Sequence, residues 1–289
     1  MVPTRERNVS AQFLTYQDEG ILVDCGEGTQ RQMNIAGLNR NRVSKVLITH
    51  WHGDHTAGLI GLIQTIGHGS QDARLMIFGP MGTKSHVEHL LKSVVFDVKI
   101  DLDVREFDPD GVETIFDSES YKIEAASLEH STPCLGYSFV EKDSWTVDAQ
   151  KAEAAGLKSG PQVSELKRTG HYSVRGKVVR IEDVARRKPG RKISFIFDTE
   201  VCQACYALAK GADVLVCEST HSVENEEKAA KYRHLTTKDA AMIANTAGVK
   251  KLIATHFSQR YKTLEKLEEE LTGFFPNTII AHDLLKLKI

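Results

Sequence analysis

The sequence contains no long hydrophobic run. None of its apolar segments approaches the roughly 20 residues that a helix needs to cross a bilayer. The opening residues, MVPTRERNVS, lack the apolar stretch of a signal peptide. With 289 residues and 41% hydrophobic content, the chain is long enough to bury a substantial core. We therefore expect a globular, cytoplasmic protein with no membrane partner.

Cysteine is scarce and odd in number. The five cysteines are scattered through apolar or helical contexts, which is not the pattern of a disulfide framework. Cys202 and Cys205 form a C-x-x-C motif, but a zinc ribbon needs a second such pair and a thioredoxin-like site needs its own preceding strand. We interpret the motif as two small, reduced residues one turn apart on a helix.

Charge is nearly balanced overall and strongly unbalanced locally. The net charge is -2, yet residues 158–192 hold eleven basic and three acidic residues, so that segment carries +8 and the rest of the chain -10. A concentrated positive field favours a polyanionic partner, because phosphate contacts release counterions. A solvated charged face is the alternative, and charge alone does not decide for nucleic acid.

Short apolar runs rich in β-branched residues alternate with helical patterns, which predicts an α/β protein. We expect strands within residues 20–26, 45–50, 75–79, 193–199, 213–220, 251–257 and 277–289. Helices are expected within residues 56–66, 84–95, 201–211, 235–248 and 261–275, several of them opened by Thr or Asp and closed by Gly. Residues 143–192 differ, since they are polar, basic and punctuated by Gly and Pro. That stretch indicates an insertion rather than a second hydrophobic domain.

Three histidines and an aspartate crowd into THWHGDH, residues 49–55. His50 and His52 follow a strand end, so their side chains can point the same way. Gly53 permits a sharp turn, and Asp54 and His55 stand at the start of a helix. Such a run can supply two adjacent metal ions, His50 and His52 to one and Asp54 and His55 to the other, because imidazole and carboxylate are ordinary zinc ligands. A histidine-rich surface turn is the plainer alternative.

Two closed coordination shells need further ligands, and three candidates follow other strands. They are His130, Asp198 and His256. Open α/β sheets place their sites where strands meet loops. Each of these residues alone is more often an ordinary loop residue, but together with H-x-H-x-D-H they favour a metal site. The other histidines, His68, His86, His89, His171, His221 and His282, have no partner at a ligand spacing, and His221 is the one expected nearest the site.

These residues resemble the metallo-β-lactamase fold and, within it, the short form of the ribonuclease Z family, the endonucleases that remove the 3′ trailer from precursor tRNA. The resemblance covers nearly the whole chain and rests on THWHGDH, on DCGEGTQRQ at 24–32 and on THFSQRY at 255–261. It implies a four-layer αββα sandwich, one catalytic domain over residues 1–289 with an inserted tRNA-binding arm at about 143–192. It also implies two zinc ions per subunit, one held by His50, His52 and His130, the other by Asp54, His55 and His256, with Asp198 bridging them.

Two further segments resemble the RNA-binding parts of the family. PTRERN, residues 3–8, is similar to its P-x-K/R-x-R-N loop, which implies that Arg5, Arg7 and Asn8 meet the tRNA acceptor end. Residues 151–170 resemble its flexible arm, with Gly160 and Pro161 as the hallmark pair. The resemblance makes Lys158, Lys167 and Arg168 candidate RNA contacts. Residues 151–170 overlap the start of the basic segment, residues 158–192.

A last pair of motifs concerns acid catalysis. CEST at 217–220 resembles the family's H-E-A-T motif and HLTT at 234–237 its H-S-T motif, with Cys217 where the family has histidine. The implied roles are that Glu218 orients His234, and that His234 protonates the departing oxygen. Asp54 is implied to orient the attacking water as well as to bind metal.

The resemblance thus implies a zinc-dependent hydrolase, an endoribonuclease that acts by two-metal phosphodiester hydrolysis. The tRNA would keep a 3′-hydroxyl and the trailer a 5′-phosphate, and the family implies a homodimer. Two alternatives stay open: a small-molecule phosphodiesterase or other hydrolase of the same fold, and a non-catalytic RNA-binding relative whose ligands have decayed. The seven intact ligand positions argue against the second alternative.

Overall fold

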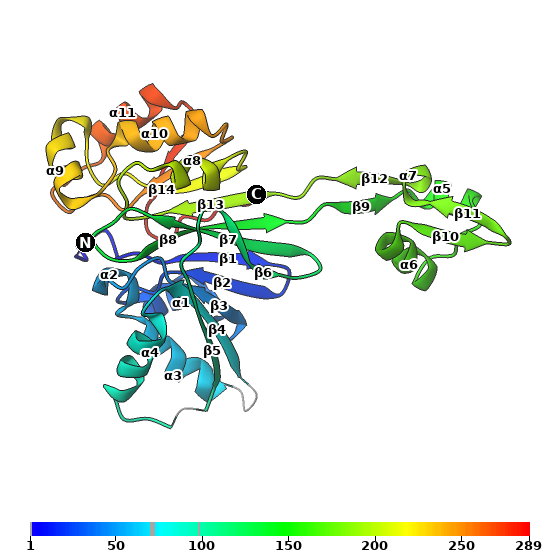
Figure 1. Ribbon diagram of the computed structural model, residues 1–289, viewed down its shortest axis with the longest axis horizontal. Helices are drawn as coiled ribbons and strands as arrows, with labels where there is room; N and C mark the ends of the chain where they lie inside the picture. Colours follow the sequence, from blue (N-terminus) through cyan, green and yellow to red (C-terminus); the bar gives the residue numbers. More distant parts are fainter. Residues whose placement is uncertain (1, 70–72, 98) are drawn as a thin grey trace. The chain divides into compact units, whose positions relative to one another are not determined.

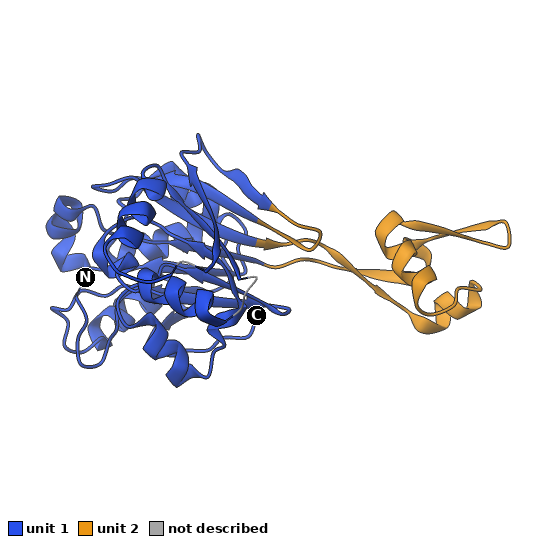
Figure 2. Cartoon of the chain, turned by 90° about the horizontal axis from the view of Figure 1, so that it is seen from below, with its two compact units in different colours: residues 1–116, 123–139, 192–289 blue, residues 117–122, 140–191 orange. Residues whose placement is uncertain are grey.

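The chain divides into two compact units in a computed structural model that describes residues 2–69, 73–97 and 99–289. Unit 1 comprises residues 1–116, 123–139 and 192–289, and unit 2 comprises residues 117–122 and 140–191 (Figure 2). Among the described residues, none of the helices combines the length and apolarity needed to span a bilayer.

The first sheet of unit 1 is built from the N-terminal third of the chain. Its five strands follow chain order, and β1 pairs antiparallel with β2 while the later neighbours pair in parallel. The interior strands are nearly continuous buried apolar runs, as expected for parallel strands covered on both faces. The strands are β1 (Gln12–Tyr16), β2 (Glu19–Val23), β3 (Val43–Leu47), β4 (Arg74–Pro80) and β5 (Asp101–Phe107).

The second sheet has seven strands in the order β16-β15-β14-β13-β8-β7-β6. Strands β13 to β16 pair in parallel, so their carboxyl ends meet at one edge. The strands are β6 (Glu113–Asp117), β7 (Tyr121–Leu128), β8 (Cys134–Glu141), β13 (Lys192–Ile196), β14 (Val214–Glu218), β15 (Leu252–Thr255) and β16 (Thr278–Ile280).

The two sheets pack face to face and helices cover their outer faces (Figure 1). The ring centroids of Tyr16 on β1 and Phe139 on β8 lie 5.1 Å apart. The Tyr137 hydroxyl on β8 donates a hydrogen bond of 2.7 Å to the carbonyl of Ile48, just beyond β3. These contacts confirm the predicted order of helix, sheet, sheet and helix.

Each outer layer of helices packs on one sheet and buries its apolar side chains. Helices α1, α3 and α4 pack on the first sheet, and α8, α10 and α11 pack on the second. The capping box of Thr236 and Asp239 starts α10, as the Thr-rich opening predicted. The helices of unit 1 are α1 (Thr29–Ala36), α2 (Gly53–Thr56), α3 (Leu59–Gly69), α4 (Thr83–Lys92), α8 (Gln203–Ala209), α9 (Glu226–Tyr232), α10 (Thr237–Thr246) and α11 (Glu265–Phe274), with 3-10 turns η1 (Arg40–Arg42) and η2 (Val223–Asn225).

The strand predicted over residues 277–289 is confirmed only at β16. Beyond Ile280 the chain turns, and Leu284 has a positive φ of 64° that no strand permits. The Asp283 carboxylate then accepts the backbone N–H of Asn8 at 3.0 Å. The C-terminal segment therefore binds the N-terminal segment instead of extending the sheet.

Unit 2 has more structure than its composition predicts. Its charged sequence hides a small buried cluster of Ala152, Leu157, Leu166, Val179, Ile181 and Val184. These residues are separated along the sequence by polar and charged ones, so no long apolar run predicts them. The elements are β9 (Ser144–Val147), α5 (Ala149–Ala154), α6 (Pro161–Thr169), β10 (His171–Val174), β11 (Lys177–Arg180), α7 (Ile181–Val184) and β12 (Ala185–Lys188), with β9 paired to β12 and β10 to β11, both antiparallel.

Candidate metal centre

The histidine-rich run lies where the first sheet gives way to a helix. Strand β3 ends at Leu47, His50 and His52 follow in the loop, and His52 is the N-cap of the short helix α2. Asp54 and His55 lie in that helix. The predicted strand followed by a helix is confirmed, but Gly53 is the first residue of α2 rather than a turn, and residues 57–58 form the turn before the next helix.

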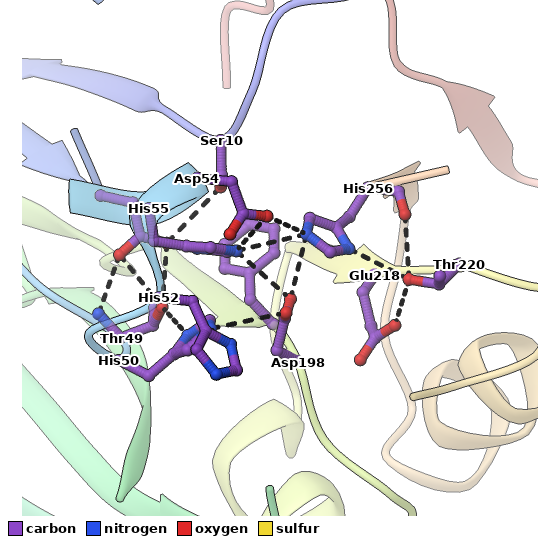
Figure 3. Close-up of polar contacts among 12 residues, drawn as sticks. Ser10, Thr49, His50, His52, Asp54, His55, Asp198, Glu218, Thr220 and His256 are labelled. Atoms are coloured by element: carbon purple, nitrogen blue, oxygen red, sulfur yellow. Dashed lines mark hydrogen bonds and ion pairs between the residues drawn. The ribbon is translucent and has the colours of Figure 1, made fainter. Parts of the chain in front are cut away.

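Three loops of the second sheet complete the cluster (Figure 3). His130 follows β7, Asp198 follows β13 and His256 follows β15. The structure brings all seven predicted ligands together, in one group of His50, His52, His130 and Asp198 and another of Asp54, His55 and His256. Within each group the candidate ligand atoms lie within 4.8 Å of one another.

Asp198 stands between the two groups. Its Oδ2 lies 3.5 Å from Nε2 of His50 and 4.0 Å from Nε2 of His130. Its Oδ1 lies 3.2 Å from Nε2 of His256 and 3.5 Å from Nε2 of His55. One carboxylate thus faces both groups with different oxygens, which is the placement that a bridging ligand requires.

Hydrogen bonds fix the histidine tautomers so that lone pairs face inward. His55 donates from Nδ1 to the Asp24 carboxylate at 2.7 Å. His256 Nδ1 lies 3.0 Å from the Thr220 hydroxyl, which gives its own proton to Glu218 at 2.5 Å and so accepts from the histidine. The two Nε2 atoms then approach to 3.2 Å. Two imidazole lone pairs repel at that distance unless a cation or a proton lies between them.

The first group shows the same arrangement. His50 Nδ1 lies 3.1 Å from the Thr49 hydroxyl, whose proton goes to Asp24. His130 donates from Nδ1 to the carbonyl of Arg233 at 3.1 Å. Its buried Nε2 has no hydrogen-bond partner among the described residues. His50 Nε2 lies 3.0 Å from Nδ1 of the exposed His52 and 3.5 Å from Asp198. Imidazoles held through Nδ1, with Nε2 beside a buried carboxylate, fit divalent metal ions.

Burial and charge put His50, His130 and Asp198 in the protonation states that metal binding needs, whereas His55 has to release a proton. Burial lowers the pKa of His50 to about 2 and also lowers the pKa of His130, so both rings are neutral. Burial opposes ionisation of Asp198, but His256 and His55 hold the pKa of its carboxyl well below the usual range. Burial disfavours charge on His55, but Asp198 and Asp24 raise its pKa, so a proton binds there when no metal does.

The sequence did not single out Asp24 as a site residue. This buried carboxylate ends β2 and accepts the backbone N–H of Thr49 at 2.8 Å as well as the His55 ring. It thereby fixes the loop that carries the histidines. The available signal was an acid at a strand end within the segment DCGEGTQRQ. Gly26 in that segment lies against the Asp54 carbonyl, where any Cβ would clash.

Several residues with a strained backbone conformation lie at this centre. Seven non-glycine residues among those described have positive φ, and three of them are Asp24 at 59°, Asp198 at 41° and His256 at 58°. The left-handed region costs a residue with a side chain of order 1 kcal/mol or more, and proteins retain such strain mostly at functional sites. Each of the three follows a strand. Figure 3 shows the side chains of Asp198 and His256 turned into the cluster, and the Asp24 carboxylate accepts from the His55 ring.

His234 and Glu218 form an ion pair beside the metal ligands. His234 Nδ1 lies 3.1 Å from Glu218 Oε2, and its ring lies 5.4 Å from that of His130. Glu218 is fully buried at the end of β14. Burial alone would lower the pKa of His234, but the charge and hydrogen bond of Glu218 raise it to about 9. His234 is therefore protonated at neutral pH in the metal-free chain and can give up a proton.

The predicted N-terminal RNA contacts are held by the protein. Arg7 donates from Nη2 to the carbonyls of Tyr261 at 2.8 Å and Ser258 at 3.4 Å, in the loop after His256. Asn8 donates from its amide to the carbonyl of Glu27 at 3.1 Å. Arg5 is exposed. Arg7 and Asn8 thus bind the metal-centre loops, and their contacts with RNA stay a prediction.

The predicted contacts in unit 2 are exposed. Gly160 caps α6 with a positive φ of 92°, and Pro161 is its first residue. Lys158, Lys167 and Arg168 are exposed in and near that helix. Their role toward RNA is untested by the fold and stays a prediction.

Six histidines lie outside the candidate ligand groups. None of His68, His86, His89, His171, His221 and His282 belongs to a group of potential ligands in the described part of the chain. His221 is the nearest, buried with its ring 6.3 Å from that of His234. His86 stacks on Trp51 instead, with ring centroids 4.7 Å apart.

A four-layer sandwich with this His/Asp cluster at the strand ends defines a protein of the metallo-β-lactamase superfamily, and the profile of that superfamily matches residues 4–71. The structure is similar to that of human tRNase Z, short form, with a TM-score of 0.72 and 27% identity over 98% of this chain and 93% of that one.

Curated relatives match the whole sequence. Ribonuclease Z of Methanothermobacter thermautotrophicus is 37% identical over 289 residues, which cover 100% of this chain and 93% of the relative. Ribonuclease Z of Methanosarcina acetivorans is also 37% identical, over 100% of this chain and 94% of the relative. The chain belongs to the ribonuclease Z family.

Proposed function

We propose that the chain is a metal-dependent endoribonuclease that removes the 3′ trailer from precursor tRNA. Its membership of the ribonuclease Z family supports this reaction. The single observation that carries it is the cluster of seven histidines and aspartates, with a candidate ligand at every expected position. A binding protein without activity would have no need to keep buried charges and strained loops there.

The metal ions are two zinc ions per subunit. His50, His52 and His130 would hold one ion, and Asp54, His55 and His256 the other, with Asp198 shared between them. The donor set of imidazole nitrogens and carboxylates supports zinc. When bound, the ions supply a water of lowered pKa and positive charge opposite the attacked phosphate.

The side chains of the chain itself carry out the remaining steps. Asp54 and Asp198 accept hydrogen bonds from the attacking water and orient it. Glu218 holds His234 through Nδ1 and keeps it protonated. His234 then gives its proton to the departing 3′ oxygen of the tRNA. The products would be a tRNA with a 3′-hydroxyl and a trailer with a 5′-phosphate.

We assign substrate binding to two regions, unit 2 and the N-terminal residues 5–8. Unit 2 is the proposed tRNA-binding arm, because its segment 158–192 carries +8 and Lys158, Lys167 and Arg168 are exposed. Gly160 and Pro161 shape the start of α6 there. Arg5, Arg7 and Asn8 are the proposed contacts of the acceptor end, and an exposed guanidinium such as that of Arg5 suits a phosphate.

The decisive experiment is cleavage of a 3′-extended precursor tRNA by the zinc-loaded protein, with the cut site mapped. We expect one cut at the acceptor end, and none after chelation or in Asp54→Ala. The matched control Asp18→Ala removes an exposed aspartate far along the sequence from every ligand and should cleave normally. If folded, metal-replete protein left the precursor intact but hydrolysed a small phosphodiester, the small-molecule phosphodiesterase would replace this proposal.

Zinc stoichiometry is tested separately from cleavage. Native mass spectrometry of the reconstituted protein should show two zinc ions per chain. His130→Ala and His256→Ala should each weaken one site, because each removes a ligand of a different group. A single ion per chain at saturating zinc would contradict the two-ion assignment.

A homodimer and a cytoplasmic location belong to the proposal as family expectations. Sedimentation of the full-length protein tests the first. If the unit 2 of one subunit serves the centre of its partner, mixing a subunit lacking residues 143–192 with an Asp54→Ala subunit should restore cleavage. Verified heterodimers without any cleavage would count against that arrangement.

A further inference from the structure

Cys202 and Cys205 are brought together at the start of α8. Cys202 is the N-cap of the helix and Cys205 lies in its first turn, and the two free thiols have their Sγ atoms 3.5 Å apart. A disulfide bond is about 2.05 Å long, so the sulfurs need to close by only about 1.5 Å. The sequence alone suggested two small, reduced residues one turn apart on a helix. Instead, the structure places Cys202 just outside the helix, facing its partner.

The two thiols differ in access. Cys202 is half-buried, whereas Cys205 is completely buried. Contact with the Cys205 thiol and with backbone groups lowers the pKa of Cys202 to about 6, although burial works against ionisation. Because its partner holds the remaining proton, the pKa of Cys205 is raised. An accessible thiolate with a buried thiol behind it has the layout of an attacking and a resolving cysteine.

The other cysteines provide an internal contrast. Cys25, Cys134 and Cys217 are buried in the core of unit 1. Burial raises the pKa of Cys25 to about 12 and that of the other two well above the usual range. Buried neutral thiols react slowly, so the pair at α8 is chemically distinct from them.

The pair is also linked to the metal centre through a short segment. Three residues separate Asp198 from Cys202, and among them the Thr199 N–H donates to Glu218 at 2.8 Å. The Glu200 N–H donates to the carbonyl of Glu129, the neighbour of His130, at 2.9 Å. Cys205 Sγ in turn lies 4.0 Å from the carbonyl of Glu200. The segment that precedes the pair is therefore hydrogen-bonded both to Glu218 and to the neighbour of His130.

We propose that Cys202 and Cys205 form a thiol–disulfide exchange site for small-molecule disulfides, and that its oxidation slows the metal centre. The Cys202 thiolate attacks one sulfur of the small disulfide and releases one thiolate, which leaves a mixed disulfide on Cys202. Cys205 then loses its proton and attacks Cys202 Sγ, which releases the second thiolate. The small disulfide is reduced to two thiols, and the protein loses two hydrogen atoms.

The test uses the full-length, zinc-loaded protein in buffers of reduced and oxidised glutathione, with alkylation and mass spectrometry as the readout. We expect a disulfide between Cys202 and Cys205 in the wild type, with the other three cysteines unmodified. Cys205→Ser removes the resolving thiol and should trap one glutathione on Cys202. Cys202→Ser is the matched control and should take up none, because Cys205 is buried.

Several results would overturn the exchange site. One is a folded wild type that forms no such disulfide at any glutathione ratio. Another is a Cys205→Ser protein that traps no glutathione. A third is protection of both thiols by zinc and their release by a chelator, which would make the pair a metal ligand set. The wild-type measurement needs no variant to fold, so it stands by itself.

The second half of the proposal rests on the proposed function and has its own readout. Oxidised wild type should cleave precursor tRNA several-fold more slowly than reduced wild type, and Cys202→Ser should cleave equally in both buffers. A disulfide that forms by mass but leaves cleavage unchanged would remove the regulatory role. If no form of the protein cleaved precursor tRNA, the proposed function would fail while the mass measurement still decided on the exchange site.

Discussion

At the scale of single residues, the metal centre depends on side chains that do not touch metal. Asp24, Thr49 and Thr220 hold the rings of His55, His50 and His256 through Nδ1. Each bond selects the tautomer whose Nε2 faces the cluster. The ligand pattern in the sequence names the histidines, but it does not name the groups that orient them.

Asp24→Asn tests this support. The amide keeps the shape of the side chain but loses the charge that accepts from His55 and Thr49, so we expect zinc affinity to fall about 10–100-fold. Competition with a zinc chelator measures the change. Asp18→Asn, the same substitution at an exposed position paired with Arg42, should leave affinity unchanged. Equal affinity in all three proteins would show that Asp24 does not support the centre.

The ion pair of Glu218 and His234 predicts a pH dependence of stability in the metal-free protein. The pKa of His234 is about 9 when folded against 6.5 for the free side chain. A raised folded-state pKa contributes stability that is fully present below pH 6.5 and is lost as the pH rises through about 9. The free energy of unfolding should therefore fall across this window.

Glu218→Gln isolates that contribution. Without the carboxylate, burial dominates and His234 is neutral, so the decline between pH 6.5 and 9 should shrink. Urea titrations at a series of pH values measure it, and the slope against pH is the readout rather than the absolute stability. Glu224→Gln, an exposed residue paired with Lys266, is the control and should keep the wild-type slope. A slope unchanged in Glu218→Gln would refute the assignment.

At the scale of elements, prediction succeeded for strands that are continuous apolar runs and for helices with clear start and stop signals. The apolar runs of β2, β3, β4, β13, β14 and β15 and the helices α3, α4, α8, α10 and α11 were all predicted within a few residues. In unit 1, strands β1, β5, β6, β7 and β8 were missed, as were α1 and α9. Strand β5, DLDVREF, alternates polar with apolar residues and has no buried residue, whereas β8, CLGYSFVE, is buried over its first six residues but includes Gly and Ser among them. Their strand state depends on neighbouring strands rather than on local hydrophobicity.

Unit 2 shows the same dependence on tertiary contacts. Leu166 on α6 is completely buried in the small cluster of that unit. Leu166→Ala should cost roughly 2–5 kcal/mol of local stability, because it leaves a cavity in a core with few other members. Limited proteolysis should then cut within residues 143–192 much faster, while unit 1 still binds zinc.

Val178→Ala is the matched control, since Val178 lies in the same unit with 63% of its surface exposed. It should leave the proteolysis pattern unchanged. If Leu166→Ala were cut no faster than Val178→Ala, the cluster would not stabilise unit 2.

At the scale of the whole molecule, charge is divided between regions of opposite sign. Residues 158–192 carry +8 within a chain of net charge -2. If these residues bind phosphates, each phosphate contact that a substitution removes should reduce the slope of log affinity against log salt concentration by about 1. The double variant Lys167→Ala/Arg168→Ala should therefore bind precursor tRNA more weakly and with a slope smaller by up to about 2.

Filter binding over a range of salt concentrations measures this slope. Lys84→Ala/Lys92→Ala removes the same charge from α4 in unit 1 and is the control. An equal loss in both double variants would mean that only total charge matters, and that unit 2 has no special role in binding.

The sequence by itself identified the candidate ligand residues, the α/β class and the family, because metal sites use a few residue types at short spacings that can be recognised along the chain. Only the tertiary structure decided which groups orient those ligands, that unit 2 has a core, and that Cys202 faces Cys205. These depend on pairs far apart in sequence or on a single side-chain direction, such as Asp24 with His55 or Arg7 with Tyr261. The local sequence pattern predicts neither kind of contact, because it gives the spacing of residues along the chain but not which distant residues the fold brings together.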